Sequence, residues 1–412
     1  MDFEYSPKVQ QLQRKLLDFM DNYVVPNIPL WRREVEAGHL HPPCMEDLKE
    51  LARSEDLWNL FLPGHAPHRL GNLEYAPLAE IMGRVHWAAE IFNCSAPDSG
   101  NIELLHMFAS DEQRRHWLEP LLDGSIRSCF AMSEPDVASS DATNIQISIR
   151  RVGDEYVING RKWFISGAAH PLCRFAVVMG VTDPDADVHR RQSMVIVPFD
   201  APGLSVVRDI PVMNHHFPGG HCELVFRDVR VPCANLIHEE GAGFAIAQAR
   251  LGPGRIHHCM RSIGQAELAL ELMCERAAER RAFGRYLHQH GAVADWIAQS
   301  RLEIEQARLL VLKTAWLIDR HGAKGALREI AMIKAIVPRM QTAICERAMQ
   351  TFGAMGLSPD TPLAELWTWG RVLRIADGPD EVHLRTVARM EMDAAGERRG
   401  STLPYMNTPD LA

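Results

Sequence analysis

Residues 145–166, IQISIRRVGDEYVINGRKWFIS, decide the fold class, because they end a helical pattern that precedes them. Between 145 and 149 three isoleucines alternate with polar residues, as in a half-buried strand. Gly153-Asp154 and then Asn159-Gly160 interrupt the alternation, and Asn-Gly between alternating segments predicts a hairpin turn. The stretch therefore predicts paired strands in the middle of the chain.

Helical periodicity flanks these strands on both sides. Apolar residues recur at helical spacing from the N-terminus to about residue 127, and again to about residue 395 once the strands have ended. Short apolar runs that begin at Arg174, Ser193 and Cys222 add strands, and residues 182–191 are expected to form a polar loop. We predict a mainly α protein with a central β domain.

The predicted domain boundaries follow these changes of periodicity. The N-terminal all-helical domain spans 1–127, the middle β domain 128–240 and the C-terminal helical bundle 241–396, with a tail at 397–412. The connections between the long helical segments of the last domain are short, as in a helix bundle.

The composition is that of a globular protein. The chain has 412 residues, 46% hydrophobic and 24% charged, so intrinsic disorder is not expected. The 44 Lys and Arg residues and 53 Asp and Glu residues give a net charge of −9, which does not favour nucleic acid or an anionic membrane as a partner. Nine cysteines without a CxxC pair indicate a reducing compartment.

The N-terminal segment MDFEYSPKVQQLQRKL has neither the apolar core of a signal peptide nor the bias of a transit peptide. No window approaches about 18 uninterrupted apolar residues, so no membrane span is expected. We expect a cytoplasmic protein or the mature form of a matrix protein.

No Walker A loop, HExxH, GxSxG or GxGxxG motif occurs, which argues against the commonest nucleotide-binding, zinc-protease and hydrolase functions. Histidines cluster at His215, His216 and His221 and again at His257-His258. A metal site needs three or four converging ligands, whereas neighbouring side chains diverge. We therefore expect no metal and assign these histidines polar or substrate-lining roles.

Two other runs could carry chemistry. The first, CFAMSEPDVASSD at 129–141, joins the helical and β parts and is dense in hydroxyl groups. The second, INGRKWFIS at 158–166, places two aromatic residues before Ser166. Taken separately, the first run is typical of a helix-capping loop and the aromatics are typical of a core. The alternative is that small side chains let a flat ligand lie on the backbone, with Ser133 as a donor to it.

Together the two runs resemble those of the acyl-CoA dehydrogenase flavoprotein family, in the same order and at a similar separation. Family members carry a Thr-Glu-Pro loop ending in Ser-Asp, then Asn-Gly, Lys and an aromatic-Ile-Ser/Thr triplet. The matching residues are Ser133-Glu134-Pro135, Ser140-Asp141, Asn159-Gly160, Lys162 and Phe164-Ile165-Ser166. The chain departs from the pattern in two places: the loop between Glu134 and Asp141 has one residue more, and Phe164 replaces the usual Trp against the flavin.

The resemblance continues into the C-terminal part and covers nearly the whole chain. Arg280-Arg281-Ala282-Phe283-Gly284 is similar to the family's Arg-x-x-Phe-Gly, whose arginine reaches the FAD pyrophosphate of a neighbouring subunit. Gln350 with Phe352-Gly353-Ala354-Met355-Gly356 resembles another FAD contact across subunits. Without the resemblance, these would be a basic pair near a helix end and a glycine-capped helix C-terminus.

The resemblance implies a fold, a cofactor and partners. The fold is an N-terminal helical domain, a middle β-barrel-like domain and a C-terminal four-helix bundle, and the cofactor is FAD. The chain is expected to form a homodimer or homotetramer and to pass electrons to an electron-transfer flavoprotein. The implied FAD-binding residues are Phe130, Met132, Ser133, Ser140, Phe164, Ser166, Arg280, Phe283, Gln350, Gly353, Pro379 and Glu381.

Desaturation of an acyl-CoA needs a base for the α proton, a hydride acceptor at the β carbon and a polarised thioester carbonyl. The family's carboxylate base lies on a loop before the last long helix, and the matching residue is Asp377. The base position of some relatives, just before Arg255, holds Gly254. By analogy, the Asp377 N–H and a flavin hydroxyl would hold the thioester oxygen. Otherwise Asp377 would be a common helix cap, with Pro379 suited to the first helical position.

Three longer runs resemble the acyl-CoA dehydrogenase 10/11-like branch of the family. They are RLGPGRIHHCMR from Arg250, EIAMIKA from Glu329 and RIADGPDEVH from Arg374. This branch is implicated in catabolism of 4-hydroxy acids, through acyl-CoA thioesters that a companion kinase phosphorylates. Because a phosphate needs cationic or imidazole donors, the expected substrate-binding residues include them: Ser140, Gly378, Arg255, His257 and His258.

Two alternatives stay open from the sequence. A flavin oxidase on the same scaffold, such as a nitroalkane oxidase, also uses an Asp as base, but its reduced flavin reacts with oxygen. A catalytically inactive flavoprotein scaffold would be colourless, or would hold FAD that no acyl-CoA reduces.

Overall fold

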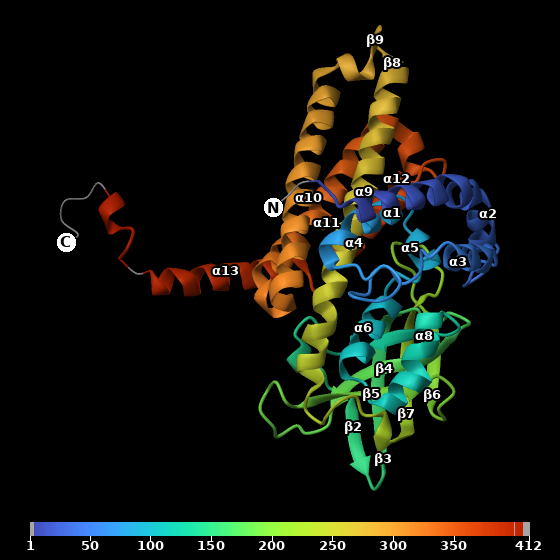
Figure 1. The fold of residues 1–412 in the computed structure, drawn as a ribbon, viewed down its shortest axis with the longest axis vertical. Coiled ribbons are helices and arrows are strands. Elements are labelled where there is room, and N and C mark those ends of the chain that lie inside the picture. Colours follow the sequence, from blue (N-terminus) through green and yellow to red (C-terminus); the bar gives the residue numbers. More distant parts are fainter. Residues whose placement is uncertain (1–3, 399, 407–412) are drawn as a thin grey trace.

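The computed structural model describes residues 4–398 and 400–406. It confirms the predicted architecture, with N-terminal helices, a central sheet and a C-terminal helical part (Figure 1). Of the predicted tail at 397–412, residues 399 and 407–412 lie outside the described part. Among the described helices, none combines the length and hydrophobicity that a bilayer-spanning segment requires.

The N-terminal third is helical because its apolar residues form stripes that can be buried together. In α1, Leu12, Leu16 and Phe19 are buried along one face, and the Ser6 hydroxyl accepts a hydrogen bond from the Val9 N–H at 3.4 Å. The elements are α1 (Pro7–Phe19), η1 (Met20–Val24), α2 (Val25–Glu36), α3 (Cys44–Ser54), α4 (Asn72–Gly83), α5 (Ala88–Ile91), α6 (Asp98–Phe108), α7 (Asp111–Gln113), η2 (Arg114–Leu118) and α8 (Glu119–Asp123).

The middle of the chain forms one curled, open sheet. The strands are β1 (Arg127–Ala131), β2 (Ser148–Val152), β3 (Glu155–Ser166), β4 (Cys173–Val181), β5 (Gln192–Pro198), β6 (Leu204–Asp209) and β7 (His221–Pro232). β3 pairs antiparallel with β7 along most of its length, while β1 runs parallel to β4 and β5 antiparallel to it. The predicted polar loop at 182–191 lies between β4 and β5.

The hairpin between β2 and β3 differs from the prediction. Its turn is Gly153-Asp154, whereas Asn159-Gly160 lies inside β3. Gly160 sits at an irregularity in the pairing with β7 and has a φ of 145°, and a Cβ there would come within 2.7 Å of Ile147. The glycine therefore permits close packing across the sheet rather than a turn.

The C-terminal part is dominated by long helices that pack side by side. They are α9 (Gly243–Glu279), α10 (Gly291–Gly325), α11 (Leu327–Phe352), α12 (Leu363–Leu373) and α13 (Asp380–Glu397), with the short hairpin β8 (Arg281–Ala282) and β9 (Arg285–Tyr286) between α9 and α10. α9 runs from the sheet to the far end of the molecule, where the hairpin lies (Figure 1). α13 contacts α11 and then projects away from the body (Figure 1).

Candidate active site

Asp377, the predicted base, lies on the loop between α12 and α13. Its φ of 55° is in the left-handed region, which Asp tolerates better than most residues. Gly378 follows with a φ of 100°, and a Cβ there would come within 2.9 Å of the His383 ring. The Asp377 carbonyl oxygen accepts hydrogen bonds from Arg255 Nε at 3.0 Å and His383 Nε2 at 3.2 Å. These contacts to the main chain hold the loop in place, and they do not involve the Asp377 carboxylate.

A buried lysine supports the same loop from α11. Lys334 is 1% exposed and donates from Nζ to the carbonyl oxygen of Leu373 and, at 3.4 Å, to that of Gly378. Burial lowers the pKa of Lys334, although the nearby Asp377 carboxylate acts in the opposite direction. No role was predicted for Lys334, although a lysine on an apolar helical stripe is a visible signal of a buried cation.

The first turn of α13 is fixed by two further cations. Asp380 is buried and pairs with the Nε atoms of Arg339 at 2.8 Å and Arg374 at 2.9 Å. Pro379, which the sequence suggested as the first helical residue, is instead the N-cap residue, and the helix begins at Asp380. Glu381, an expected FAD-binding residue, is exposed to solvent. The acidic residues in the first turn of α13 are therefore Asp380 and Glu381, and the predicted base lies before the helix.

The Asp377 carboxylate faces α9. Its Oδ2 atom is 3.4 Å from His258 Nε2. A Cβ on Gly254 would lie 3.7 Å from the same oxygen. Any residue other than glycine at position 254 would therefore bring its Cβ into van der Waals contact with the carboxylate.

Cations surround this carboxylate and decide its protonation state. Burial alone would raise the pKa of Asp377, but its basic neighbours outweigh burial and leave the pKa below its ordinary value. These neighbours are His258, Arg250, Lys334 and Arg255. Burial lowers the pKa of His258 itself to about 3, so at neutral pH the imidazole is uncharged and the other three supply the positive charge. Asp377 is therefore ionised at neutral pH, as a base must be.

A second acid near these cations is neutral. Glu103 of α6 is 5% exposed, and burial raises its pKa to about 8, against the opposing charge of Arg250. At neutral pH Glu103 therefore carries a proton and does not offset the cations. The surroundings of Asp377 are consequently rich in positive charge.

The two runs singled out in the sequence lie side by side. The Trp163 N–H donates to the Ser133 carbonyl oxygen at 3.0 Å, which joins β3 to the loop after β1. Phe164 has a φ of 51° and is 46% exposed, with its ring centroid 5.1 Å from that of Trp163. The Ser166 hydroxyl is 2.9 Å from His221 Nδ1. An accessible aromatic ring thus stands beside a loop rich in hydroxyl groups.

Glu134 of this loop is part of a buried ion pair. Its carboxylate accepts hydrogen bonds from the N–H groups of Gln146 at 2.8 Å and Ile147 at 2.9 Å, and it pairs with Lys162 Nζ at 2.9 Å. Lys162 also donates to the Met132 carbonyl oxygen at 2.7 Å. Burial lowers the pKa of Lys162 to about 8, although attraction to Glu134 acts the other way. The pair therefore fixes the loop that holds the predicted FAD residues.

The remaining predicted FAD residues have different settings. One face of the Phe130 ring is covered by the Arg250 guanidinium, 4.0 Å from the ring centroid. Ser140, expected to contact both FAD and substrate, is exposed. Phe130 thus links the predicted FAD loop to a cation of the Asp377 site.

Four predicted FAD residues lie far from the loop after β1. Arg280 and Phe283 lie at the β8–β9 hairpin, at the end of the molecule opposite the sheet (Figure 1), and Phe283 is 96% exposed. Gln350 and Gly353 are exposed where α11 ends. Within one chain, these residues do not share a site with Phe164.

His257 faces the N-terminal helices. It is 1% exposed, and its ring packs edge-on against Phe61 and Tyr75, with centroids 5.9 and 5.2 Å apart. Its neighbour His258 is the histidine that the structure brings to Asp377. Of the two histidines expected to bind substrate, only His258 therefore lies at the predicted base.

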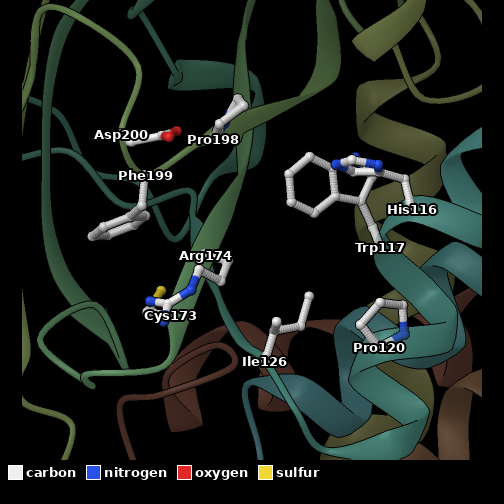
Figure 2. Close-up of a pocket in the computed structure, with 9 residues that line it drawn as sticks. All are labelled: His116, Trp117, Pro120, Ile126, Cys173, Arg174, Pro198, Phe199 and Asp200. Carbon is white, nitrogen blue, oxygen red and sulfur yellow. The ribbon is translucent and has the colours of Figure 1, made fainter.

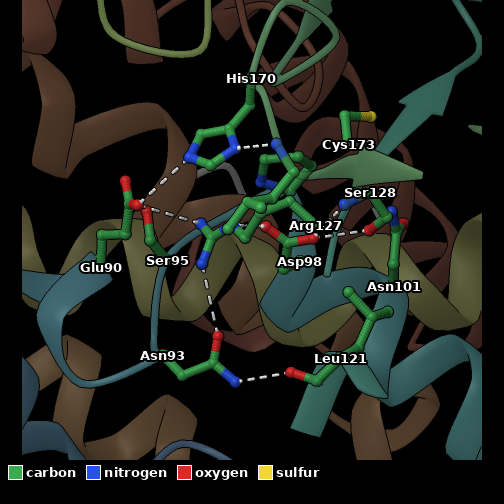
Figure 3. A network of polar contacts seen from close by, with 12 residues as sticks. Glu90, Asn93, Ser95, Asp98, Asn101, Leu121, Arg127, Ser128, His170 and Cys173 are labelled. Atoms are coloured by element: carbon green, nitrogen blue, oxygen red, sulfur yellow. Dashed lines mark hydrogen bonds and ion pairs between the residues drawn. The ribbon is translucent and has the colours of Figure 1, made fainter. Parts of the chain in front are cut away.

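His41, Glu90 and His170 place potential metal ligands within 4.8 Å of one another. However, Glu90 already has cationic partners, Lys49 Nζ at 3.1 Å and Arg127 at 3.8 Å. These charges hold the pKa of Glu90 well below its ordinary range, although burial acts to raise it. Figure 3 shows how Arg127 extends this network into the core.

The hydrogen bonds of the two histidines also oppose a metal. His170 Nδ1 accepts from the Leu172 N–H at 3.1 Å, so a neutral His170 carries its proton on Nε2. That proton is donated to His41 Nδ1 at 3.0 Å, and His41 Nε2 in turn lies 2.7 Å from Glu46. A metal on His170 Nε2 would have to displace this proton. The cluster is therefore a hydrogen-bonded link between the N-terminal helices and the sheet.

A cleft lies elsewhere in the described structure. It has a volume of about 790 Å³ and opens between the η2–α8 segment and strands β4 and β5 (Figure 2). Trp117 and Phe199 line it together with Arg174 and Asp200. No residue of the predicted site belongs to the described lining of this cleft, so its size is not an argument about the chemistry at Asp377.

Comparisons with known proteins now identify the chain. Three domain models match it: acyl-CoA dehydrogenase, N-terminal domain, over residues 6–125; the middle domain over 129–229; and the C-terminal domain over 241–392. The chain belongs to the acyl-CoA dehydrogenase family. It is accordingly an FAD-dependent oxidoreductase that acts on CH–CH bonds of acyl-CoA.

Individual relatives are similar over nearly the whole chain. FadE2 of Mycobacterium tuberculosis is 55% identical over 397 residues, which cover 95% of this chain and 97% of FadE2. Acyl-CoA dehydrogenase family member 11 of Gallus gallus is 52% identical, but this chain spans only 51% of its length. A solved acyl-CoA dehydrogenase homologue from Mycobacterium abscessus is 48% identical, with a TM-score of 0.92 over 95% of this chain and 100% of the homologue.

The side chains present fit the family's cofactor. The half-exposed Phe164 ring, two residues before Ser166 and next to the Trp163 N–H that binds the Ser133 carbonyl oxygen, suits a flat isoalloxazine. Arg280 and Gln350 are exposed and suit the charged and polar remainder of the dinucleotide. Because these two groups of residues lie apart in one chain, they fit the cofactor together only if two chains meet.

Proposed function

We propose that Asp377 is the base that removes the α proton of an acyl-CoA thioester. The observation that carries this proposal is an ionised carboxylate that faces Gly254 of α9, on a loop whose main-chain oxygen accepts hydrogen bonds from Arg255 and His383. When bound, FAD supplies through its N5 atom the acceptor for the hydride that leaves the β carbon. Asp is one methylene shorter than Glu, so the α carbon must sit roughly 1 Å closer than to a Glu base.

In this proposal the cations near Asp377 also stabilise the thioester during the reaction. As the α proton leaves, negative charge develops on the thioester oxygen. Arg250, Arg255 and Lys334 lie close enough to Asp377 to lower its pKa, so they also stabilise negative charge beside it. The Asp377 N–H is the proposed donor to the thioester oxygen.

We propose further that the acyl chain carries an anionic 4-substituent, made by phosphorylation of a 4-hydroxyacyl-CoA by a companion kinase. The support is the positive charge around Asp377, to which neutral Glu103 adds no compensating charge. Arg255 is the proposed donor to that group, because both ring nitrogens of His258 already have partners, Arg261 and Asp377. His257 no longer belongs to this proposal, because its ring packs against Phe61 and Tyr75.

The assembly and electron acceptor complete the proposed function. The exposed hairpin at Arg280 and Phe283 would complete the FAD site of another subunit in a homodimer or homotetramer. An electron-transfer flavoprotein would then reoxidise the reduced enzyme.

Anaerobic titration of the FAD-loaded protein tests the reaction. Plain, 4-hydroxy and 4-phospho acyl-CoA thioesters are added in turn, and the loss of oxidised-flavin absorbance is followed. We expect reduction by acyl-CoA and slow reoxidation in air. FAD that no acyl-CoA reduces would support an inactive scaffold, and reoxidation by oxygen within seconds would support an oxidase.

A further inference from the structure

A chain of polar contacts reaches the Asp377 carboxylate from the N-terminal helical part. Arg261 of α9 donates from one guanidinium nitrogen to the Cys94 carbonyl oxygen at 3.1 Å. Its other terminal nitrogen is 3.2 Å from His258 Nδ1. His258 Nε2 then faces Asp377 Oδ2 at 3.4 Å. The four residues come from three separate parts of the chain.

Arg261 fixes the tautomer of His258. A guanidinium has only donors, so His258 Nδ1 must be the acceptor in that contact. Burial and the charge of Arg261 lower the pKa of His258 to about 3, so the ring is neutral. A neutral imidazole with an accepting Nδ1 carries its proton on Nε2. The proton, and not a lone pair, is therefore on the ring nitrogen that lies 3.4 Å from the Asp377 carboxylate.

We propose that His258 is a positioning residue for Asp377, which it holds through Nε2–H toward Oδ2 while Arg261 locks the required tautomer. This inference rests on the proposed function, because it concerns the orientation of the proposed base. With Oδ2 turned to His258, Oδ1 is the oxygen left to meet the α proton. A short Asp side chain makes this orientation matter, because proton transfer requires close approach.

The other groups around Asp377 act differently. Arg255 and His383 bind its main-chain oxygen, and Lys334 binds carbonyl oxygens of the same loop. Arg250 contributes charge from α9 but is engaged by Asn101 at 3.0 Å. These contacts set the position of the loop and the local potential. His258 acts on the carboxylate itself.

The test compares two variants of His258 in the FAD-loaded enzyme. His258→Leu removes the N–H, whereas the amide of Gln can return an N–H near the former Nε2 position. The measured quantity is the rate of flavin reduction in anaerobic single turnovers across pH. Because the N–H stabilises the ionised carboxylate, its loss raises the pKa of Asp377. We expect the acid limb of the profile to move up by about one pH unit in His258→Leu and to return toward wild type in His258→Gln.

Nitrogen-15 NMR of the imidazoles gives a readout independent of turnover. The difference between wild type and His258→Gln isolates the His258 signals, which we expect to show a neutral ring protonated on Nε2 between pH 5 and 8. A cationic ring, or a proton on Nδ1, would overturn the proposal. So would equal pH profiles for wild type and His258→Leu.

A control and a second variant separate the possible failures. His106→Gln changes an exposed histidine on α6 and should leave the profile unchanged. If Asp377→Asn still reduces its flavin at the wild-type rate, the proposed base itself is wrong. If Asp377→Asn is inactive while His258→Leu keeps the wild-type profile, only the positioning role fails.

Discussion

The ammonium group of Lys162 lies 2.9 Å from the Glu134 carboxylate, and both side chains are buried. Glu134→Gln would leave the cation without a charged partner in a site that excludes water. We expect this variant to lower the free energy of unfolding by about 3 to 5 kcal/mol. The midpoint of urea unfolding of the apoprotein measures the loss.

An exposed ion pair beside the same loop gives the control. Asp136 lies 2.9 Å from Arg161, and both side chains are largely accessible to solvent. Since exposed pairs contribute little, Asp136→Asn should leave the midpoint nearly unchanged. Equal losses in the two variants would show that burial of the Lys162 pair has no special effect.

Asp377→Asn should retain FAD and acyl-CoA binding but lose flavin reduction, because an amide of nearly the same shape cannot accept a proton. The expected loss is at least about 10²- to 10⁴-fold, the range assigned to a positioned base. Asp377→Glu keeps a carboxylate displaced by one methylene and should retain more activity than Asn. Stopped-flow measurement of flavin reduction by acyl-CoA gives both rates. If Asp377→Asn reduces its flavin as fast as the wild type, Asp377 is not the base.

The proposed sharing of the FAD site between chains predicts that FAD binding depends on assembly. Arg280→Gln removes a charged donor from an exposed hairpin, so it should weaken FAD binding roughly 10- to 100-fold without unfolding the chain. FAD content and molar mass in solution are measured together, and we expect one FAD per subunit in an oligomer only. A monomer with stoichiometric FAD would contradict the shared site.

The proposed anionic 4-substituent predicts a substrate preference that depends on Arg255. The wild-type enzyme should have a higher kcat/KM for 4-phospho than for plain acyl-CoA, and Arg255→Gln should reduce that ratio roughly 10- to 100-fold. Arg255 also binds the Asp377 carbonyl oxygen, so its loss can slow the reaction with both substrates. The test is therefore the ratio of the two kcat/KM values and not either value alone. Equal kcat/KM values of the wild-type enzyme for the 4-phospho and plain substrates would contradict the proposed 4-substituent.

Glu103 predicts a pH dependence of stability. Burial raises its pKa from 4.5 to about 8, so between these values the folded state holds a proton that the unfolded state releases. The stability that neutral Glu103 contributes is complete below pH 4.5 and is lost as pH rises toward 8. Glu103→Gln stays neutral, so its stability relative to wild type should rise across this window, by at most about 1.4 kcal/mol per pH unit. The midpoints of urea unfolding of both proteins at pH 4.5 and pH 8 measure this change. A difference between the two proteins that is the same at both pH values would contradict the prediction.

Local patterns in the sequence predicted elements well where one segment contains the whole signal. The stripe of Leu12, Leu16 and Phe19 is a buried helix face, and the polar loop at 182–191 joins two strands as expected. Asn159-Gly160 was misplaced because its local signal is that of a turn. Its actual role depends on Ile147, which packs where a Cβ would stand, and only tertiary structure brings this residue to it.

The candidate site was predictable only in part for the same reason. Asp377 could be found because the residues that follow it match a known motif. The cations that control its ionisation, Arg250 and Lys334, are 127 and 43 residues away in the numbering, and no local pattern joins them to the loop. Likewise, the local sequence around Glu134 is typical of a turn. Its ion pair with Lys162 of β3 forms only in the folded structure.

The separation of the β8–β9 hairpin from the Asp377 loop has a genetic consequence. If Arg280 of each chain serves its partner's cofactor, the Arg280 and Asp377 of one chain belong to different sites. A chain defective only in Arg280, mixed with one defective only in Asp377, would assemble one site in which both residues are intact. Two alleles that are each inactive alone would then complement one another in the same cell, and neither would rescue a second copy of itself.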